Sequence, residues 1–260
     1  MPWVFRGLRD GVVTTGYPRR PDDYAETGVR SLAQPRQGAR WEPGLDALCP
    51  TGAISEEHGA PRLDQGRCIG CGACVAARPD TFTWQTAGAT ARLTRRALVV
   101  PELPETDGEL RALRHRLSLR TKALRRSVHI RHVDAGSDGS EEWEVLALLN
   151  PVYDVHRLGI FFTASPRHAD ILLVTGVGTH GMAAPLARTL QALPRPLVVI
   201  AAGTDAISGG LVCPSYAGAG GIGEQVPVDV WVPGSPPSPF SLLHAILLAT
   251  GRLPGTERAP

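Results

Sequence analysis

The two halves of the chain differ in the pattern of their apolar positions. From about residue 127 onward, short continuous runs of Val, Ile and Leu alternate with longer stretches whose apolar residues recur at helical spacing. Continuous apolar runs between helices are typical of strands in a parallel sheet that is covered on both faces. This half is therefore predicted to be an α/β domain whose ligand site lies in the loops at the carboxyl ends of the strands. The predicted strands are Val128–Val133, Gly159–Thr163, Ile171–Val174, Leu197–Ala201 and Val228–Trp231, and the predicted helices are Val145–Leu149, Met182–Leu193 and Pro237–Thr250.

The first half has fewer apolar runs and is rich in Arg, Gly and Pro, which predicts smaller units. Residues 1–40 are expected to form an extended arm laid over a neighbouring surface, with a disordered tail as the alternative. Residues 41–105 are expected to form a small α+β domain. It would contain a short helix before Cys49, a turn over residues 58–61 and a hairpin over residues 84–98.

A basic linker helix is predicted over residues 106–127, followed by the α/β domain over residues 128–260. Thr106 or Asp107 would cap this helix. Residues 107–133 carry eight Lys and Arg against two acidic residues. This charge favours a contact with an acidic partner or with anionic headgroups; the alternative is a solvated face on a tether helix. The predicted apolar stripe consists of Leu110, Leu113, Leu117 and Leu124.

Length and charge narrow the possible classes of protein. A chain of 260 residues can hold two domains with a sizeable core. No apolar run approaches the roughly 18–20 residues that span a bilayer. The net charge of +2 conceals an asymmetry, with 21 Lys and Arg against 14 Asp and Glu up to residue 133, and 6 against 11 after it. A basic front and an acidic back indicate docking surfaces more than nucleic-acid binding.

Three cysteines follow one another at C-x2-C-x2-C spacing, at Cys68, Cys71 and Cys74. This spacing allows three thiolates to bind three corners of a 4Fe–4S cubane. In the bacterial ferredoxin run, a fourth cysteine before a proline binds the other cluster of a two-cluster domain. Arg78 stands at that position here, and the Cys-Pro pair that begins at Cys49 supplies the missing ligand. We therefore expect a bacterial-ferredoxin-like domain with one 4Fe–4S cluster on these four cysteines.

The other cluster of the two-cluster pattern is predicted to be absent. Counting back from Cys49, its remaining ligands would fall at Ala39, Glu42 and Leu45. A structural zinc site in the four thiolates is the alternative, but a triple with a distant Cys-Pro favours iron–sulfur. We expect no disulfides, because the spacing suits cofactor ligation and the sequence shows no secretory signal. Cys213 is expected to be a plain buried or half-buried thiol.

The second half resembles one known family through separate motifs that occur in the family's order. These motifs are Asn150–Val155, Ala164–Asp170 with Leu172–Gly176, and Pro227–Gly234. They resemble the small subunit of membrane-bound, energy-converting nickel–iron hydrogenases, which include formate hydrogenlyase, and are similar to the B-type subunit of respiratory complex I. The resemblance covers residues 127–255 and implies a flavodoxin-like sheet. Residues 1–100 are similar to the ferredoxin-type subunit of the same complexes, so the chain resembles a fusion of two adjacent electron-transfer subunits.

In that family the small subunit holds a proximal 4Fe–4S cluster, with cysteines in a C-x2-C loop, a G-x-C loop and a G-C-P-P loop. At the matching positions this chain has Asp138, Glu141, Asp205 and Ser235. Oxygen ligands do not substitute for four thiolates around a cubane, so the proximal cluster is expected to be absent. The three acids would then form a proton relay or bind a hard cation such as Mg²⁺ or Ca²⁺; the alternative is a collapsed, solvated vestige.

The resemblance implies a non-catalytic electron-transfer or scaffold subunit of a hydrogenase-related or complex I-related oxidoreductase. Its expected partners are a large hydrogenase-like (complex I D-type) subunit, membrane-arm subunits and a soluble electron carrier, with no nucleic acid. Its expected place is the cytoplasmic side, peripheral on the inner face of the cell membrane. The alternative function is a structural or regulatory assembly module, with the acidic pocket serving proton transfer or hard-cation binding.

Overall fold

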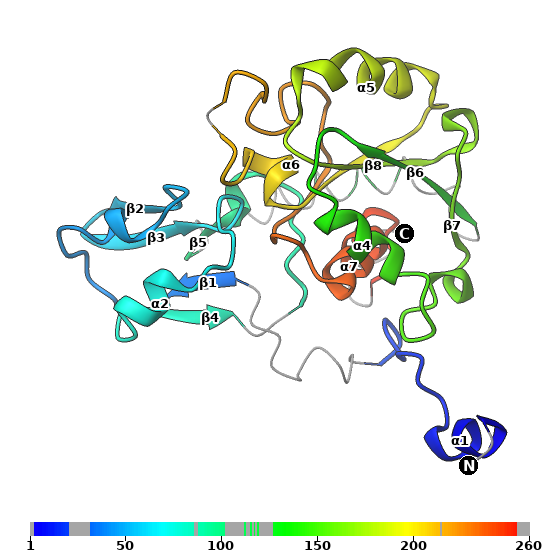
Figure 1. Ribbon diagram of the computed structural model, residues 1–260, viewed down its shortest axis with the longest axis horizontal. Coiled ribbons are helices and arrows are strands. Elements are labelled where there is room, and N and C mark those ends of the chain that lie inside the picture. Colours follow the sequence, from blue (N-terminus) through cyan, green and yellow to red (C-terminus); the bar gives the residue numbers. More distant parts are fainter. Residues whose placement is uncertain are drawn as a thin grey trace.

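The computed structural model describes residues 3–20, 32–85, 88–101, 112, 115, 117, 119, 127–213 and 215–253. Figure 1 shows a small antiparallel module, in blue and cyan, beside a larger α/β domain. Most of the predicted basic helix over residues 106–127 lies outside the described residues. The positions that are described within it, Ala112, His115, Leu117 and Leu119, are helical. Leu117 is buried in the core of the α/β domain.

The α/β domain is built on a five-stranded parallel sheet with the strand order β10-β9-β8-β6-β7. This is the doubly wound order of flavodoxin, so the predicted fold class is confirmed. The order in which strands are added to the sheet reverses between β6 and β8. Such switch points open a crevice beyond the carboxyl ends of the strands. The strands are β6 (Val128–Asp134), β7 (Ile160–Phe162), β8 (Ile171–Thr175), β9 (Val198–Ala202) and β10 (Val230–Val232).

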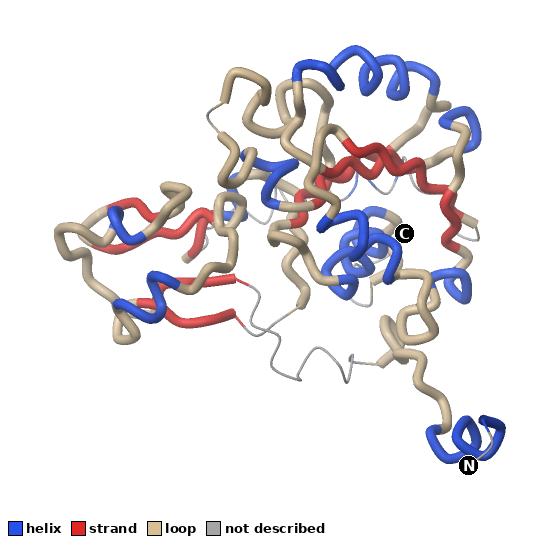
Figure 2. The backbone as a smooth tube through the Cα atoms, viewed as in Figure 1, coloured by secondary structure: helices blue, strands red, loops and turns tan. Residues whose placement is uncertain are grey.

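Helices cover both faces of this sheet because its central strands are apolar on both sides. In β8, Ile171 and Leu173 face one core, while Leu172 and Val174 face the other. The first core is closed by α4 (Ser140–Ala147) and α7 (Pro239–Ala249), and the second by α5 (His180–Ala192) and α6 (Thr204–Ser208). Figures 1 and 2 show α5 on the opposite side of the sheet from α4 and α7. Two short 3-10 helices, Val155–Leu158 and Pro166–His168, complete the connections.

Strand and helix positions agree with the prediction to within a few residues, with two exceptions. The first helix begins at Ser140 instead of Val145, because the acidic residues ahead of Val145 also join it. The short helix α6 was not predicted, since five residues are too few to show an apolar period.

The small module contains two antiparallel sheets around a separate core. The first joins β1 (Leu32–Pro35) to β4 (Phe82–Gln85), and the second joins β2 (Ile54–Glu57), β3 (Ala60–Asp64) and β5 (Val99–Val100). The predicted hairpin over residues 84–98 is wrong, because β4 pairs with β1 from the expected arm and β5 pairs with β3. The remaining elements are α2 (Ala73–Ala77) and the 3-10 helices Asp46–Leu48 and Arg96–Leu98.

The first twenty residues combine an exposed helix with a segment laid on the α/β domain. Helix α1 (Trp3–Asp10) has no buried residue. Further on, the Thr15 amide donates to the Val152 carbonyl at 2.8 Å, and the Tyr17 ring meets Phe240 at a centroid distance of 4.8 Å. Among the described residues, no helix combines the length and apolarity needed to cross a bilayer.

Candidate iron–sulfur site and the acidic pocket beside it

The structure brings together the four cysteines that were predicted as ligands. Cys49 follows the 3-10 helix Asp46–Leu48, while Cys68, Cys71 and Cys74 lie in the loop after β3 and the first turn of α2. Burial, together with the neighbouring Cys68, Cys49 and Cys71, raises the pKa of Cys74 to about 11. The pKa of Cys68 is raised chiefly by burial, with smaller contributions from Cys49 and Cys71.

This donor set fits an iron–sulfur cluster chemically. Thiolates that are buried and close to one another repel, so these cysteines favour the neutral thiol form. A positively charged metal centre would stabilise the thiolates and displace the thiol protons. Among the described residues, no three His, Cys, Asp or Glu side chains converge as ligands of a single metal ion do. A cubane takes its protein ligands at separate irons, so its thiolates stand further apart than those of one ion.

Local hydrogen bonds join the Cys49 turn to the Cys68–Cys74 loop. The Ala53 amide donates to the Cys49 sulfur at 3.2 Å, and the Thr51 hydroxyl donates to the Arg67 carbonyl at 2.6 Å. Gly72 has φ +77°, and a Cβ there would lie 2.8 Å from the Trp84 ring, so only glycine allows this close approach. The two segments are thereby held as one ligand frame.

The positions at which the sequence predicts that a second ferredoxin cluster is absent make a different set of contacts. Arg78 Nη2 pairs with Glu42 Oε2 at 2.5 Å. Leu45 is almost fully buried in the core of the small module. Two of the missing ligand positions therefore form an ion pair, and a third contributes to the hydrophobic core.

The acidic positions of the α/β domain lie at the carboxyl ends of its strands. Asp138 precedes α4, Glu141 lies in its first turn, and Asp205 lies in α6 directly after β9. Ser235 follows β10, two residues before the buried Pro237, and is exposed, as is Asp138. Glu141 is only 1% exposed, and Asp205 is half-buried.

The three acids act on one another electrostatically. Burial raises the pKa of Glu141 to about 7, helped first by Asp205 and then by Glu142 and Asp138. Burial also raises the pKa of Asp205, with Asp138 and Glu142 adding to the shift. Hydrogen bonds from Ser140 lower the pKa of Asp138 instead. The structure therefore gathers the three predicted carboxylates but gives them different environments.

A fourth acid, Glu142, is held by polar side chains at the switch point between β6 and β8. The Ser137 hydroxyl donates to its Oε2 at 2.7 Å, and the Thr175 hydroxyl donates to its Oε1. His132 Nε2 lies 3.6 Å from Oε1, and burial lowers the pKa of this histidine. Sequence reasoning missed this network, although the acidic run directly after β6 indicated a polar site there.

The two candidate sites touch through α6, which the sequence did not predict. The Thr204 hydroxyl donates to the Cys68 carbonyl at 2.9 Å, and the Ser208 hydroxyl donates to the Gly66 carbonyl at 2.8 Å. A Cβ on Gly66 would lie 2.8 Å from Ile207, so the cluster loop is pressed against the helix. One face of α6 therefore meets the cluster loop, and Asp205 of the same helix acts electrostatically on Glu141.

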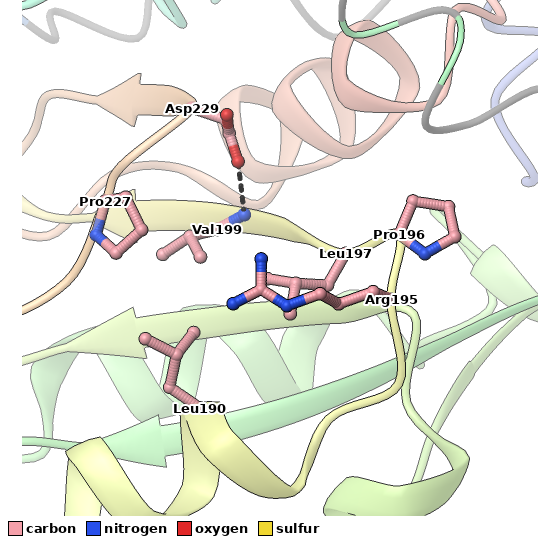
Figure 3. Close-up of a pocket in the computed structure, with 7 residues that line it drawn as sticks. All are labelled: Leu190, Arg195, Pro196, Leu197, Val199, Pro227 and Asp229. Carbon is pink, nitrogen blue, oxygen red and sulfur yellow. Dashed lines mark hydrogen bonds between the residues drawn. The ribbon is translucent and has the colours of Figure 1, made fainter.

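A surface pocket of about 420 Å³ lies at the other edge of the sheet. It is formed by the end of α5, by Arg195 and by residues at the amino ends of β9 and β10 (Figure 3). Asp229 in its wall accepts a hydrogen bond from the Val199 amide at 3.0 Å. The Asp229 carboxylate thus joins β9 to the segment that leads into β10. The pocket is separate from both candidate sites.

Comparisons with known proteins agree with the two-part organisation. The family described as the 20 kDa subunit of NADH ubiquinone oxidoreductase matches residues 139–249, and a 4Fe-4S single cluster domain matches residues 62–110. The probable membrane-bound hydrogenase subunit mbhJ of Pyrococcus furiosus is 37% identical over 147 residues, which cover 56% of this chain and 88% of that protein. This chain belongs to the family of the 20 kDa subunit of NADH ubiquinone oxidoreductase.

Other similar proteins differ in how much of their length is matched. Formate hydrogenlyase subunit 7 of Escherichia coli (strain K12) is 42% identical over 132 residues, which cover 51% of this chain and 52% of that protein. The match thus spans about half of the length of that relative. A chain of the membrane-bound sulfane sulfur reductase, an archaeal respiratory membrane complex, aligns with a TM-score of 0.45 and 29% identity over 52% of this chain and 77% of that chain. The family resemblance of the sequence motifs is confirmed.

Proposed function

We propose that this chain is an iron–sulfur electron-transfer and scaffold subunit of a membrane-associated oxidoreductase complex related to hydrogenases and complex I. The observation that carries the proposal is the fusion of a four-cysteine ferredoxin-type module to a 20 kDa-subunit domain, with the two joined at Thr204 and Cys68. The first relatives are named as subunits of a formate hydrogenlyase and of a membrane-bound hydrogenase. The chain itself is proposed to be non-catalytic.

The ligands of the proposed cluster are Cys49, Cys68, Cys71 and Cys74. A bound 4Fe–4S cluster supplies one-electron transfer. The chain's own residues hold the thiolates in a common frame, and Trp84 covers the loop at Gly72. The hydrogen bond from Thr204 joins the cluster loop to the α/β domain.

We propose one cluster in the described chain and no proximal cluster. The support is chemical, because Asp138, Glu141, Asp205 and Ser235 offer oxygen atoms where the family has thiolates. In the small module, the Arg78–Glu42 ion pair and the buried Leu45 occupy three ligand positions of the lost ferredoxin cluster.

The proposed partners follow from the family. They are a large hydrogenase-like subunit, membrane-arm subunits and a soluble electron carrier, with the chain peripheral on the inner face of the membrane. The proposed units are the arm over residues 1–40, the ferredoxin-like domain over 41–105, the basic linker helix over 106–127 and the α/β domain over 128–260. Strand β1 lies within the proposed arm but pairs with β4 of the small module.

Iron and sulfide analysis, combined with EPR of the reduced protein, tests this proposal. About four irons per chain and one cubane signal are expected. About eight irons would show that a second cluster is present, and zinc in place of iron would overturn the cluster itself. Reversible reduction by a soluble ferredoxin supports electron transfer. A potential outside the range of physiological donors would support the alternative of an assembly module.

A further inference from the structure

The most unusual side chain outside the cysteine site is Glu141, which stands where the family has a cluster ligand. It is 1% exposed, and within the described part of the chain its Oε1 has no hydrogen-bond partner. Apart from a hydrogen bond from its own backbone amide, the carboxyl accepts only a long contact of 3.4 Å, from the Ser140 hydroxyl to Oε2. A buried carboxylate with one unpartnered oxygen is costly, whereas the neutral acid is tolerated in such a place.

The walls around Glu141 add negative charge. A Cβ on Gly203 would lie 2.5 Å from Glu141 Oε1, so the carboxyl lies directly against the loop after β9. The charged groups that act on it are Asp205 on α6, Glu142 on α4 and Asp138 in the loop before α4. Each of these favours the protonated form of Glu141, and burial raises its pKa to about 7. The group therefore changes charge close to neutral pH.

The carboxyl is joined to the cluster loop by a short stretch of protein. Gly203 meets Glu141, and the next residue, Thr204, donates its hydroxyl hydrogen bond to the carbonyl of the proposed ligand Cys68. Thr204 is fully buried, so little water screens charges across this contact. A negative charge added to the cysteine site would raise the proton affinity of a nearby acid.

We propose that Glu141 is a proton-binding site that is filled when the cluster on Cys49, Cys68, Cys71 and Cys74 is reduced. The inference rests on the proposed function for the presence of that cluster. One electron passes from a low-potential one-electron carrier to the cluster, so the carrier is oxidised and the cluster reduced. One proton passes from the solvent to the Glu141 carboxylate, which becomes a neutral carboxylic acid. Oxidation of the cluster reverses both steps.

The test is an EPR-monitored redox titration of the full chain between pH 5.5 and 9. The midpoint potential is expected to fall as pH rises through the neutral range, because the reduced protein binds the proton more tightly. A proton affinity ten times higher in the reduced state corresponds to a total change of about 59 mV. Glu141→Gln is expected to remove the dependence. Glu144→Gln, which lies one turn further along α4, is the matched control and is expected to keep it.

Two further readouts keep the test decisive if Glu141→Gln folds poorly. Asp205→Asn removes a neighbouring negative charge. In this variant, the pH range over which the midpoint potential changes is therefore expected to lie at lower pH than in the wild-type protein. Infrared difference spectra between the oxidised and reduced states are expected to show a protonated carboxyl appearing on reduction near pH 7. A potential independent of pH in the wild-type protein, or an unchanged pH range in Asp205→Asn, would overturn the inference.

Failure of this inference can be told apart from failure of the proposed function. If the protein holds no reducible cluster, no cubane EPR signal appears and the proposed function is wrong. If the cluster is present and reducible but its midpoint potential does not depend on pH, only the role of Glu141 is wrong.

Discussion

The two halves of this molecule differ in the side chains at their candidate cluster sites. The small module keeps four thiols in a frame that is set by the Thr51–Arg67 bond and by the close approach of Trp84 to Gly72. The α/β domain carries side-chain oxygen atoms at the four positions that we propose to match the family's cluster ligands. At its switch point, a Cβ on Gly176 would lie 2.6 Å from the backbone of Gly136, so the loops there are tightly packed.

The comparison leads to the hypothesis that the shape of a cluster-binding loop does not depend on its ligands. In this hypothesis, backbone contacts and glycines fix the loop, and the side chains at the ligand positions decide what it binds. At the positions where we propose that thiols are absent, the protein has carboxylates in one case, and an ion pair and a core leucine in the other. The predictions that follow test whether this division between loop shape and ligand identity is correct.

The largest expected effect comes from removing one thiol of the small module. Cys71→Ala is expected to abolish iron binding, because a cubane needs all four thiolates. Cys71 is exposed, so the loss would come from ligation rather than from a cavity in the core. Iron analysis and the visible absorption of the purified protein measure the effect. Cys213→Ala is the control, and loss of iron in that variant would contradict the assignment of ligands.

Restoring the thiols of the α/β domain is expected to have the next largest effect. If the loops keep their shape, the variant Asp138→Cys, Glu141→Cys, Asp205→Cys, Ser235→Cys is expected to raise the iron content from about four to about eight per chain. A second cubane signal in EPR would accompany the gain. A properly folded variant that still holds about four irons would show that the loops have diverged along with the ligands.

Glu141→Gln is expected to change stability in a pH-dependent way. The folded-state pKa of about 7 lies above the ordinary value of 4.5, so Glu141 contributes favourably below pH 4.5 and this contribution is lost as pH rises through 7. The loss amounts to about 3 kcal/mol at high pH. Glutamine does not ionise, so its burial carries no such cost. The free energy of unfolding of the variant is therefore expected to rise relative to that of the wild type as pH increases from 5 to 8. Urea denaturation across this range measures the difference, and parallel curves would refute a buried titrating carboxyl.

Gly203→Ala tests the wall against which Glu141 lies. The new methyl group would lie 2.5 Å from Glu141 Oε1, and φ +99° is a conformation that side chains rarely adopt. The expected cost is about 2–3 kcal/mol of unfolding free energy. Gly181→Ala is the matched control, because Gly181 lies in α5 with nothing near its Cβ position, so this change is expected to be neutral or stabilising. Equal effects of the two changes in thermal denaturation would count against the close packing.

Thr204→Val tests the link between the two halves and is expected to have the smallest effect. Valine keeps the shape but leaves the Cys68 carbonyl without the hydroxyl donor, at an expected cost of about 1–2 kcal/mol. Thr189→Val is the control, because its hydroxyl bonds an exposed helix carbonyl in α5. Chemical denaturation compares the two, and a cost no larger than the control would mean that the link contributes little.

Local patterns predicted what depends on local sequence. Three of the parallel strands were predicted because they contain continuous apolar runs, and the two that begin at Val128 and Val228 because polar residues alternate with apolar ones there. The cysteine set was predicted because its spacing is typical of one cofactor. The pairing of β1 with β4 was missed, because about fifty residues separate the strands and no turn joins them. The contact of Thr204 and Ser208 with the cluster loop was missed for the same reason, since it joins residues more than 130 positions apart.

The β1–β4 ladder also decides where the chain can be cut. Leu32 and Ala33 are almost fully buried, and Phe82, which pairs with Pro35, is fully buried. A fragment that began at residue 41 would leave β4 as an open sheet edge beside an exposed phenylalanine, and such edges promote aggregation. A soluble fragment of the small module should therefore include β1, so the boundary for expressing it lies before Leu32.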